Sequence, residues 1–374
     1  MKKYLLSFAV LLMGAALFTA CNDDNDGPYY PFPVVESDGM YVVCTGNKSA
    51  SIDGSLSYYN YSTGQMTLNA FSSVNARPLG LTPNDLLVHG SKVYIVVNGE
   101  HTIEVADAKT LRSLKQIKTT DLLGNDNGHD PRCLTAYGDR VYFSTYGGVV
   151  AAIDTINYEL QDTYEAGSYP EDIMIVNGYL YVANSDYGKN TNPSISKIDL
   201  RTGETVEYKD ALITNPQKFY YANGSIYFLD YGTYDSSWNQ KDAGVRQMFS
   251  NGEVIKAFDA TAADQYGDVF FFYNAPYKSK PDDFEITYGT YSATSGVKTL
   301  NLEGLFSPAA IGVDPVNGYL FVASLTKNED TEKPNYRANG YVNQYALDGS
   351  LVKSNIPCGT GPTAICFNIG IKYE

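Results

Sequence analysis

The fifteen residues PEDIMIVNGYLYVAN, from Pro170 to Asn184, carry the pattern that decides the fold. They begin with a proline and a short apolar run, pass through an Asn-Gly pair, and end in a run of tyrosine and branched side chains. Asn-Gly between two such runs is a strong signal for a tight β-hairpin. The stretch therefore predicts two antiparallel strands joined by a short turn.

The same unit recurs along the chain. The other copies are PNDLLVHGSKVYIVVN from Pro83, PRCLTAYGDRVYFST from Pro131, PQKFYYANGSIYFLD from Pro216 and PAAIGVDPVNGYLFVAS from Pro308. Successive copies begin 48, 39, 46 and 92 residues apart, so one copy is missing near residue 262. ADQYGDVFFFYN, which begins at Ala263, fills that place without the leading proline.

A second hairpin follows each copy, as in LSYYNYSTGQM from Leu56, ISKIDLRTGETV from Ile195 and VNQYALDGSLV from Val342. Each unit therefore contains four strands, which we call A to D in chain order. Four strands in a repeat of 40–50 residues are typical of a β-propeller blade. The heavy use of tyrosine, with 33 residues, also suits pleated sheets.

The two ends of the repeat region indicate how the ring closes. GMYVVCTG from Gly39 reads as a strand B with no strand A before it, and GPTAICFNIG from Gly361 reads as a strand A with no strand B after it. Joined, they make one complete unit, and such closure removes open sheet edges. The sequence thus predicts one all-β domain over residues 38–374, a seven-bladed propeller whose last strand completes the first blade.

The N-terminus has the composition of a secretory signal. Lys2 and Lys3 precede an apolar run from Tyr4 to Phe18, and Cys21 follows. With cysteine at the junction, the segment resembles a bacterial lipobox, which implies cleavage after residue 20 and lipidation of Cys21. An ordinary signal peptide with a chance cysteine is the alternative.

Residues 21–37 are expected to form a linker after the signal. The run NDDNDGPYYPFP directly follows Cys21 and resembles the acidic surface-export signal of Bacteroidetes lipoproteins, with a solvated spacer as the alternative. A lipid-anchored protein on the outer surface of the outer membrane is therefore expected.

Charge and cysteine content limit the classes of partner. The formal charge is −15 for the whole chain and −17 without residues 1–20, which contain two lysines and no acid. Nucleic acid is not expected as a partner, because phosphate binding depends on lysine and arginine. The four cysteines Cys44, Cys133, Cys358 and Cys366 either pair in one of three ways or remain buried thiols, and their spacing predicts no zinc site.

Loop lengths predict the binding face. The loops between strands B and C are long in blades one and four to seven and short in blades two and three. Long loops in a compact domain are usually functional or disordered, and these loops are rich in aromatic residues. The predicted ligand-binding residues are Asn98, Tyr146, Asn184, Tyr187, Lys189, Asp230, Tyr231, Tyr234, Trp238, Tyr273, Asn274, Tyr277, Tyr336 and Arg337. The alternative is that the rings only pack against neighbouring loops.

No motif predicts an enzyme. Metal-protease, nucleophile-elbow and phosphate-loop patterns are missing from the sequence, and Asp282–Asp283 fits a solvated loop. NDNGHD, from Asn125 to Asp130, lacks the spacing of a calcium-binding EF-hand and is interpreted as a polar connection. We expect no cofactor, and the sequence assigns no metal ligands, while the presence of a bound metal ion stays open.

The strand cores YVAN (Tyr181–Asn184) and YIVVN (Tyr94–Asn98) resemble the YVTN-type propeller repeat. Together with the lipobox, the acidic run and the aromatic loops, the chain resembles the surface propeller lipoproteins of Bacteroidetes that bind cobalamin. The resemblance implies capture of a corrinoid and its delivery to a TonB-dependent outer-membrane transporter. A glycan-binding propeller, a metal-dependent lactonase or lyase, and a purely structural surface protein are the alternatives.

Overall fold

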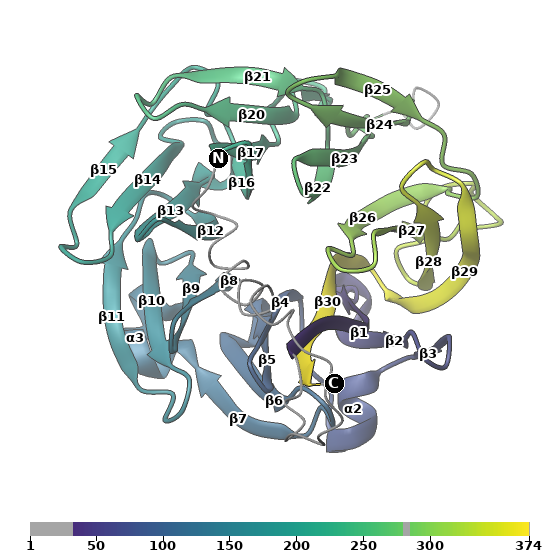
Figure 1. The fold of residues 1–374 in the computed structure, drawn as a ribbon, viewed down its shortest axis with the longest axis horizontal. Helices are drawn as coiled ribbons and strands as arrows, with labels where there is room; N and C mark the ends of the chain where they lie inside the picture. The colour runs from purple at the N-terminus through teal and green to yellow at the C-terminus, as the bar shows by residue number, and fades with distance from the viewer. Residues whose placement is uncertain (1–32, 280–284, 374) are drawn as a thin grey trace, which may run out of the picture.

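Seven four-stranded antiparallel sheets form a closed ring in the computed structural model, which describes residues 33–279 and 285–373 (Figure 1). The strands of each sheet run outward from the centre in the order A to D. The predicted all-β, seven-bladed propeller is confirmed. The predicted signal peptide, the lipidation site at Cys21 and the acidic run lie outside the described residues.

The strand bounds follow the repeat. Blade one contains β30 (Pro362–Tyr373), β1 (Pro33–Cys44), β2 (Ser55–Asn60) and β3 (Gln65–Thr67). Blade two contains β4 (Pro83–His89), β5 (Lys92–Val97), β6 (Thr102–Asp107) and β7 (Ser113–Lys118). Blade three contains β8 (Pro131–Tyr137), β9 (Arg140–Thr145), β10 (Val149–Asp154) and β11 (Leu160–Glu165). Blade four contains β12 (Pro170–Val176), β13 (Tyr179–Asn184), β14 (Ser194–Asp199) and β15 (Thr205–Tyr208).

The remaining three blades keep the same order. Blade five contains β16 (Pro216–Ala222), β17 (Ser225–Asp230), β20 (Gly244–Met248) and β21 (Val254–Phe258). Blade six contains β22 (Ala262–Tyr266), β23 (Val269–Asn274), β24 (Thr287–Ser292) and β25 (Gly296–Leu300). Blade seven contains β26 (Ser307–Val313), β27 (Tyr319–Leu325), β28 (Asn339–Ala346) and β29 (Leu351–Thr360). The copy without its proline thus forms a regular blade.

The first and last strands of the chain close the ring, as predicted. β1 pairs antiparallel with β30, with Tyr41 opposite Cys366 and Pro33 opposite Tyr373. Both strands have 12 residues, twice the length of most neighbours. β1 therefore begins at Pro33, five residues before the predicted domain boundary, because its extra length continues the pairing with β30.

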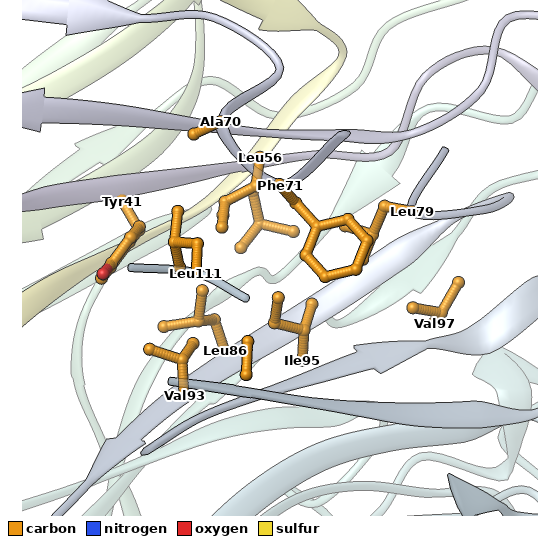
Figure 2. Packing of buried hydrophobic residues seen from close by; sticks show 12 residues of the cluster. Tyr41, Leu56, Ala70, Phe71, Leu79, Leu86, Val93, Ile95, Val97 and Leu111 are labelled. Carbon is orange, nitrogen blue, oxygen red and sulfur yellow. The ribbon is translucent and has the colours of Figure 1, made fainter. Parts of the chain in front are cut away.

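Apolar side chains fill the interfaces between adjacent blades. Between blades one and two, for example, Tyr41 and Leu56 of blade one pack with Val93 and Ile95 of blade two (Figure 2). Phe71, from the connection between these two blades, joins the same cluster. Equivalent clusters lie at the other six blade interfaces. Because each strand in the blade interior buries both faces, the strands read as near-continuous apolar runs rather than alternating ones.

Two short helices occur where the sequence predicts loops. α2 (Ala70–Asn75) lies between blades one and two, and α3 (Thr119–Gly128) lies between blades two and three. α3 is broken by Gly124 at φ 79°, and the Thr119 hydroxyl donates to the Gly128 carbonyl at 2.6 Å. NDNGHD lies between the last strand of blade two and the first strand of blade three, so its interpretation as a polar connection is confirmed, with its first part in helical turns.

Aspartates on the innermost strands of blades two, four and six each link their blade to the next one. The carboxylates of Asp85, Asp172 and Asp264 accept hydrogen bonds from backbone N–H groups of the following blade. The donors are Leu134, Phe219 and Val313, at 2.7–2.8 Å. These residues hold the ring together at its centre, and their repetition in PND, PED and AAD is visible in the sequence. The four cysteines are free thiols, and Cys44 and Cys358 are buried.

Candidate functional site

The long loops lie on one face of the ring, because strands B and C meet there in every blade. The loop of blade five carries its own small hairpin, β18 (Thr233–Tyr234) with β19 (Gln240–Lys241). Five predicted aromatic residues on these loops are exposed, and Trp238 is the most exposed at 71%. We call this group the aromatic rim: Tyr187, Tyr234, Trp238, Tyr277 and Tyr336.

The blade-four and blade-five loops enclose a depression of about 440 Å³. Lys189, Tyr234 and Trp238 line it, as the sequence predicts, together with Asp235. The Tyr234 and Trp238 rings are 6.4 Å apart between centroids and tilted by 50°. The depression therefore offers two apolar ring faces, a cation and a carboxylate to a ligand.

Hydrogen bonds fix the shape of the blade-five hairpin. The Asp235 carboxylate accepts from the N–H groups of Ser237 and Asn239, both at 2.9 Å. Hydrogen bonds, first among them the one from the Asn239 backbone, lower the pKa of Asp235 to about 2. The hairpin is thus held by an ionised carboxylate across the physiological pH range.

The hairpin is also attached to the loop of blade six. The Gln240 N–H donates to the Tyr277 carbonyl at 2.9 Å, and the Tyr277 N–H donates to Gln240 Oε1 at 3.0 Å. Asn239 Oδ1 accepts from the Ser279 N–H at 3.0 Å. The aromatic residues of two neighbouring blades are therefore fixed relative to each other.

Tyr187 lies on a strained turn at the edge of blade four. Asp186 and Tyr187 both have positive φ angles, 52° and 55°, which residues other than glycine rarely adopt. The Asp186 carboxylate accepts from Thr191 and Asn192, and although burial opposes its ionisation, these hydrogen bonds hold its pKa at about 2. The carboxylate stabilises the turn that exposes the Tyr187 ring.

Tyr187 belongs to a cluster of three tyrosines. Its ring centroid lies 5.8 Å from that of Tyr146 and 5.1 Å from that of Tyr169. The Lys189 ammonium lies 4.8 Å from the Tyr169 ring centroid. The structure thus brings together three predicted residues and adds Tyr169, which the sequence places in a connection between blades without marking it as a ligand contact.

Two predicted residues are buried inside the blades and are corrected here. Asn184 has no exposed surface, and its amide donates to the hydroxyls of Ser194 and Ser196. Asp230 is equally buried and accepts from Thr214, Asn215 and Gly232. Both side chains connect the strand end to the loops, so neither faces a ligand.

The other predicted residues divide between rim and interior. Asn98 is half-buried and donates to the Pro131 carbonyl of the next blade at 3.2 Å, so it also bridges blades. Arg337 is exposed beside Tyr336, and Asn274 is half-buried at the end of β23. Tyr231 and Tyr273 face the central channel rather than the rim.

A charged network in the central channel is the main feature that the sequence prediction missed. Arg132 Nε lies 2.7 Å from a Glu171 oxygen, and the Tyr146 hydroxyl donates to the other Glu171 oxygen at 2.7 Å. The Arg132 guanidinium also lies over the Tyr146 ring, 4.8 Å from its centroid. Only the residue directly after each repeat proline signals this network, since Arg132 and Glu171 both occupy that position.

Carboxyl groups deeper in the channel have shifted pKa values. Burial raises the pKa of Asp85 to about 6 and that of Asp172 to about 7. Burial works against the charge on Lys218, but the Asp264 carboxylate, 3.6 Å away, outweighs it and holds the Lys218 pKa above its usual range. The channel therefore contains ion pairs together with carboxyls that lack a close cation.

The three histidines form no metal centre with neighbouring residues. Asp130 connects two of them, with its carboxylate 2.9 Å from His129 Nδ1 and its N–H donating to His101 Nδ1. Over residues 33–279 and 285–373, no cluster of three or more His, Cys, Asp or Glu side chains is arranged to hold a metal ion.

In the same part of the chain, no helix is long and apolar enough to span a membrane.

The sequence was compared with known protein families and with curated proteins. A family model described as a domain of unknown function (DUF5074) matches residues 38–214, which span three strands of blade one and all of blades two to four. No curated protein matches the chain. The family match covers less than half of the chain.

Solved structures share the propeller fold at low sequence identity. Hydrazine synthase of Kuenenia stuttgartiensis is 14% identical, with a TM-score of 0.56 over 78% of this chain and 95% of that one. A protein of Bacteroides fragilis provisionally named 6-phosphogluconolactonase is 16% identical, with a TM-score of 0.55 over 89% and 98%. A Bacteroides uniformis protein with the same provisional name is 14% identical, with a TM-score of 0.55 over 88% and 99%. At these identities the similarity is one of fold alone.

Proposed function

We propose that the protein captures a corrinoid of the cobalamin type on its aromatic rim and acts as a binding protein rather than an enzyme. One observation carries the proposal: exposed rings on the loops of four consecutive blades lie on one face, and two of them line a depression with Lys189. A large ligand with apolar faces and many amide groups suits such a surface, because rings contribute apolar area and nearby polar groups fix orientation.

The number of rings is sufficient for tight binding. A rigid ring that buries about 150–250 Å² contributes roughly 4–6 kcal/mol as an upper bound. Association costs on the order of 4–15 kcal/mol. One or two rings would therefore bind weakly, whereas four or more can hold a bulky ligand.

The choice of corrinoid rests on the resemblance of the signal, the acidic run and the repeat to cobalamin-binding lipoproteins. On that reading, lipid at Cys21 attaches the protein to the outer membrane, and a TonB-dependent barrel transporter receives the ligand. Lipidation is tested by mass spectrometry of the membrane-extracted protein. The transporter is tested by co-purification from outer membranes after mild crosslinking.

The ligand class is tested by gel filtration of the secreted chain, residues 22–374, with cyanocobalamin. We expect the coloured ligand to co-elute with the protein, and co-elution to be lost when Tyr234 and Trp238 are both replaced by alanine. A glycan array serves as the matched alternative, since exposed tyrosine and tryptophan rings also bind sugars. Strong glycan binding without corrinoid co-elution would replace this proposal by a glycan-binding function.

A further inference from the structure

The central channel contains a cavity that is separate from the aromatic rim. Its volume is about 250 Å³, and it lies among the innermost strands of all seven blades. The cavity is smaller than the depression of about 440 Å³ on the rim, and it suits a small molecule rather than a corrinoid.

The walls of the cavity differ in chemistry around the ring. Blades two to five contribute charged and polar side chains, among them Arg132, Glu171, Asp172 and Lys218. Blades six, seven and one contribute uncharged side chains, among them Ala309, Ile365 and Tyr273. The charged groups therefore lie on one side of the cavity, and the other side is largely apolar.

Two tyrosine hydroxyls on this wall have no protein partner. Tyr273 is only 5% exposed and lines the cavity, and its hydroxyl makes no hydrogen bond within residues 33–279 and 285–373. Tyr231 lines the same wall, and within the described chain its hydroxyl is also free of hydrogen bonds. Both hydroxyls open onto the space of the cavity, so each is available to donate to or accept from a polar ligand.

The charge balance of the channel indicates which ligand fits. Arg132 is paired with Glu171, and Lys218 lies 3.6 Å from Asp264, whereas within the described residues Asp85 and Asp172 form no ion pair and feel Lys218 only from a greater distance. An anionic ligand would meet an excess of carboxyl groups. A hydroxyl group, in contrast, can donate to a carboxylate and accept from Lys218 or a tyrosine hydroxyl at the same time.

We propose that the central channel binds a polyhydroxylated, non-anionic molecule of about monosaccharide size, held by Lys218, Tyr231 and Tyr273. This site is independent of corrinoid capture on the rim. The proposal concerns binding alone and involves no chemical step.

The test uses sugar rings that differ in charge. Saturation-transfer NMR and calorimetry on the secreted chain are carried out with D-glucose, D-galactose and D-mannose as neutral probes, D-glucosamine as the cation and D-glucuronate as the anion, all at millimolar concentration. We expect at least one neutral hexose to bind, glucosamine to bind at least as well as glucose, and glucuronate to bind most weakly.

Three variants locate the binding. Tyr273→Phe removes one hydroxyl and should weaken binding about fivefold, the effect of one hydrogen bond. Lys218→Met should weaken it about tenfold or more, since a charged donor is lost. Ala309→Leu fills the cavity and should abolish binding. Tyr137→Ala, an exposed tyrosine outside both the rim and the channel, serves as the control and should leave hexose binding unchanged.

Folding of each variant is checked by circular dichroism and thermal unfolding, and Tyr273→Phe, which keeps the ring, remains informative if the others unfold. The proposal is overturned if no neutral hexose binds, if glucuronate binds most tightly, or if folded channel variants bind as well as the unchanged protein. None of these outcomes bears on corrinoid binding, which is measured separately.

Discussion

The aromatic rim and the central channel differ in how their side chains are held. Rim residues such as Trp238 are exposed and lie on loops that are hydrogen-bonded to neighbouring loops. Channel residues such as Arg132 and Glu171 lie on the innermost strands and are bonded to each other across blades. The comparison indicates that substitutions on the rim should leave the stability of the fold nearly unchanged. Substitutions in the channel should lower that stability.

The largest expected effect is on stability, from a channel residue. Arg132→Ala leaves the buried Glu171 carboxylate without its cation, and losing one partner of a buried pair costs about 3–5 kcal/mol. The free energy of unfolding in urea measures the change. Arg337→Ala, an exposed arginine on the blade-seven loop, is the control and should change stability by less than about 0.5 kcal/mol. Equal effects of the two variants would remove the distinction between rim and channel.

The next effect is on ligand affinity, from the rim. Replacing both Tyr234 and Trp238 by alanine should weaken cyanocobalamin binding about 100-fold, since ring side chains at binding hot spots often contribute 2 kcal/mol or more each. Stability should stay within about 0.5 kcal/mol of the unchanged protein. Tyr137→Ala, an exposed tyrosine on the opposite face, is the matched control and should bind normally. A loss of affinity in Tyr137→Ala would contradict the assignment of the binding face.

The pH dependence of stability should come from the channel. Burial raises the folded-state pKa of Asp172 to about 7, above its unfolded value near 4. The folded state therefore holds a proton that the unfolded state has lost, and stability falls as pH rises from about 4 through 7. Asp172→Asn carries no charge and its amide oxygen can still accept from Phe219.

We expect the fall in stability between pH 5 and pH 8 to shrink by about 1–2 kcal/mol in Asp172→Asn, since one pKa unit corresponds to 1.36 kcal/mol. Urea unfolding at several pH values measures it. An unchanged slope would show that Asp172 is ionised throughout this range in the folded protein.

The smallest effect concerns the turn that exposes Tyr187. The low pKa of Asp186, about 2, means that its carboxylate stabilises the turn at all pH values above the unfolded value near 4 and loses that effect as pH falls toward 2. Corrinoid affinity should therefore be constant from pH 5 to pH 8. Asp186→Asn should weaken affinity about threefold, the scale of one lost hydrogen bond, and calorimetry at the two pH values checks both statements.

The sequence predicts the ring far better than it predicts the site. Seven repeats of strand and turn signals determine the blades, and the incomplete units at Gly39 and Gly361 determine closure, because these signals are local and repeated. Asn184 and Asp230 were predicted at the rim since each ends a strand at the loop-rich face. Inside the blades, Asn184 is bonded to serines of the adjacent strand β14 and Asp230 to Thr214 of the preceding connection, which no local pattern reveals.

The channel was missed for a related reason. Arg132 and Glu171 are 39 residues apart and occupy the same position in two repeats, so their contact arises only when adjacent blades pack. The rim was found because a long loop with exposed rings is visible in one stretch of sequence. Features carried by one stretch of sequence can therefore be predicted from it. Contacts between residues of different repeats can be predicted only once the packing of adjacent blades is known.

Calorimetric titration of residues 22–374 with cyanocobalamin tests the central claim most directly. The account predicts saturable binding of one ligand per chain at micromolar concentration or below, with the heat lost in the variant that lacks the Tyr234 and Trp238 rings. The absence of binding heat at micromolar protein and ligand, or equal binding by that variant, would contradict it.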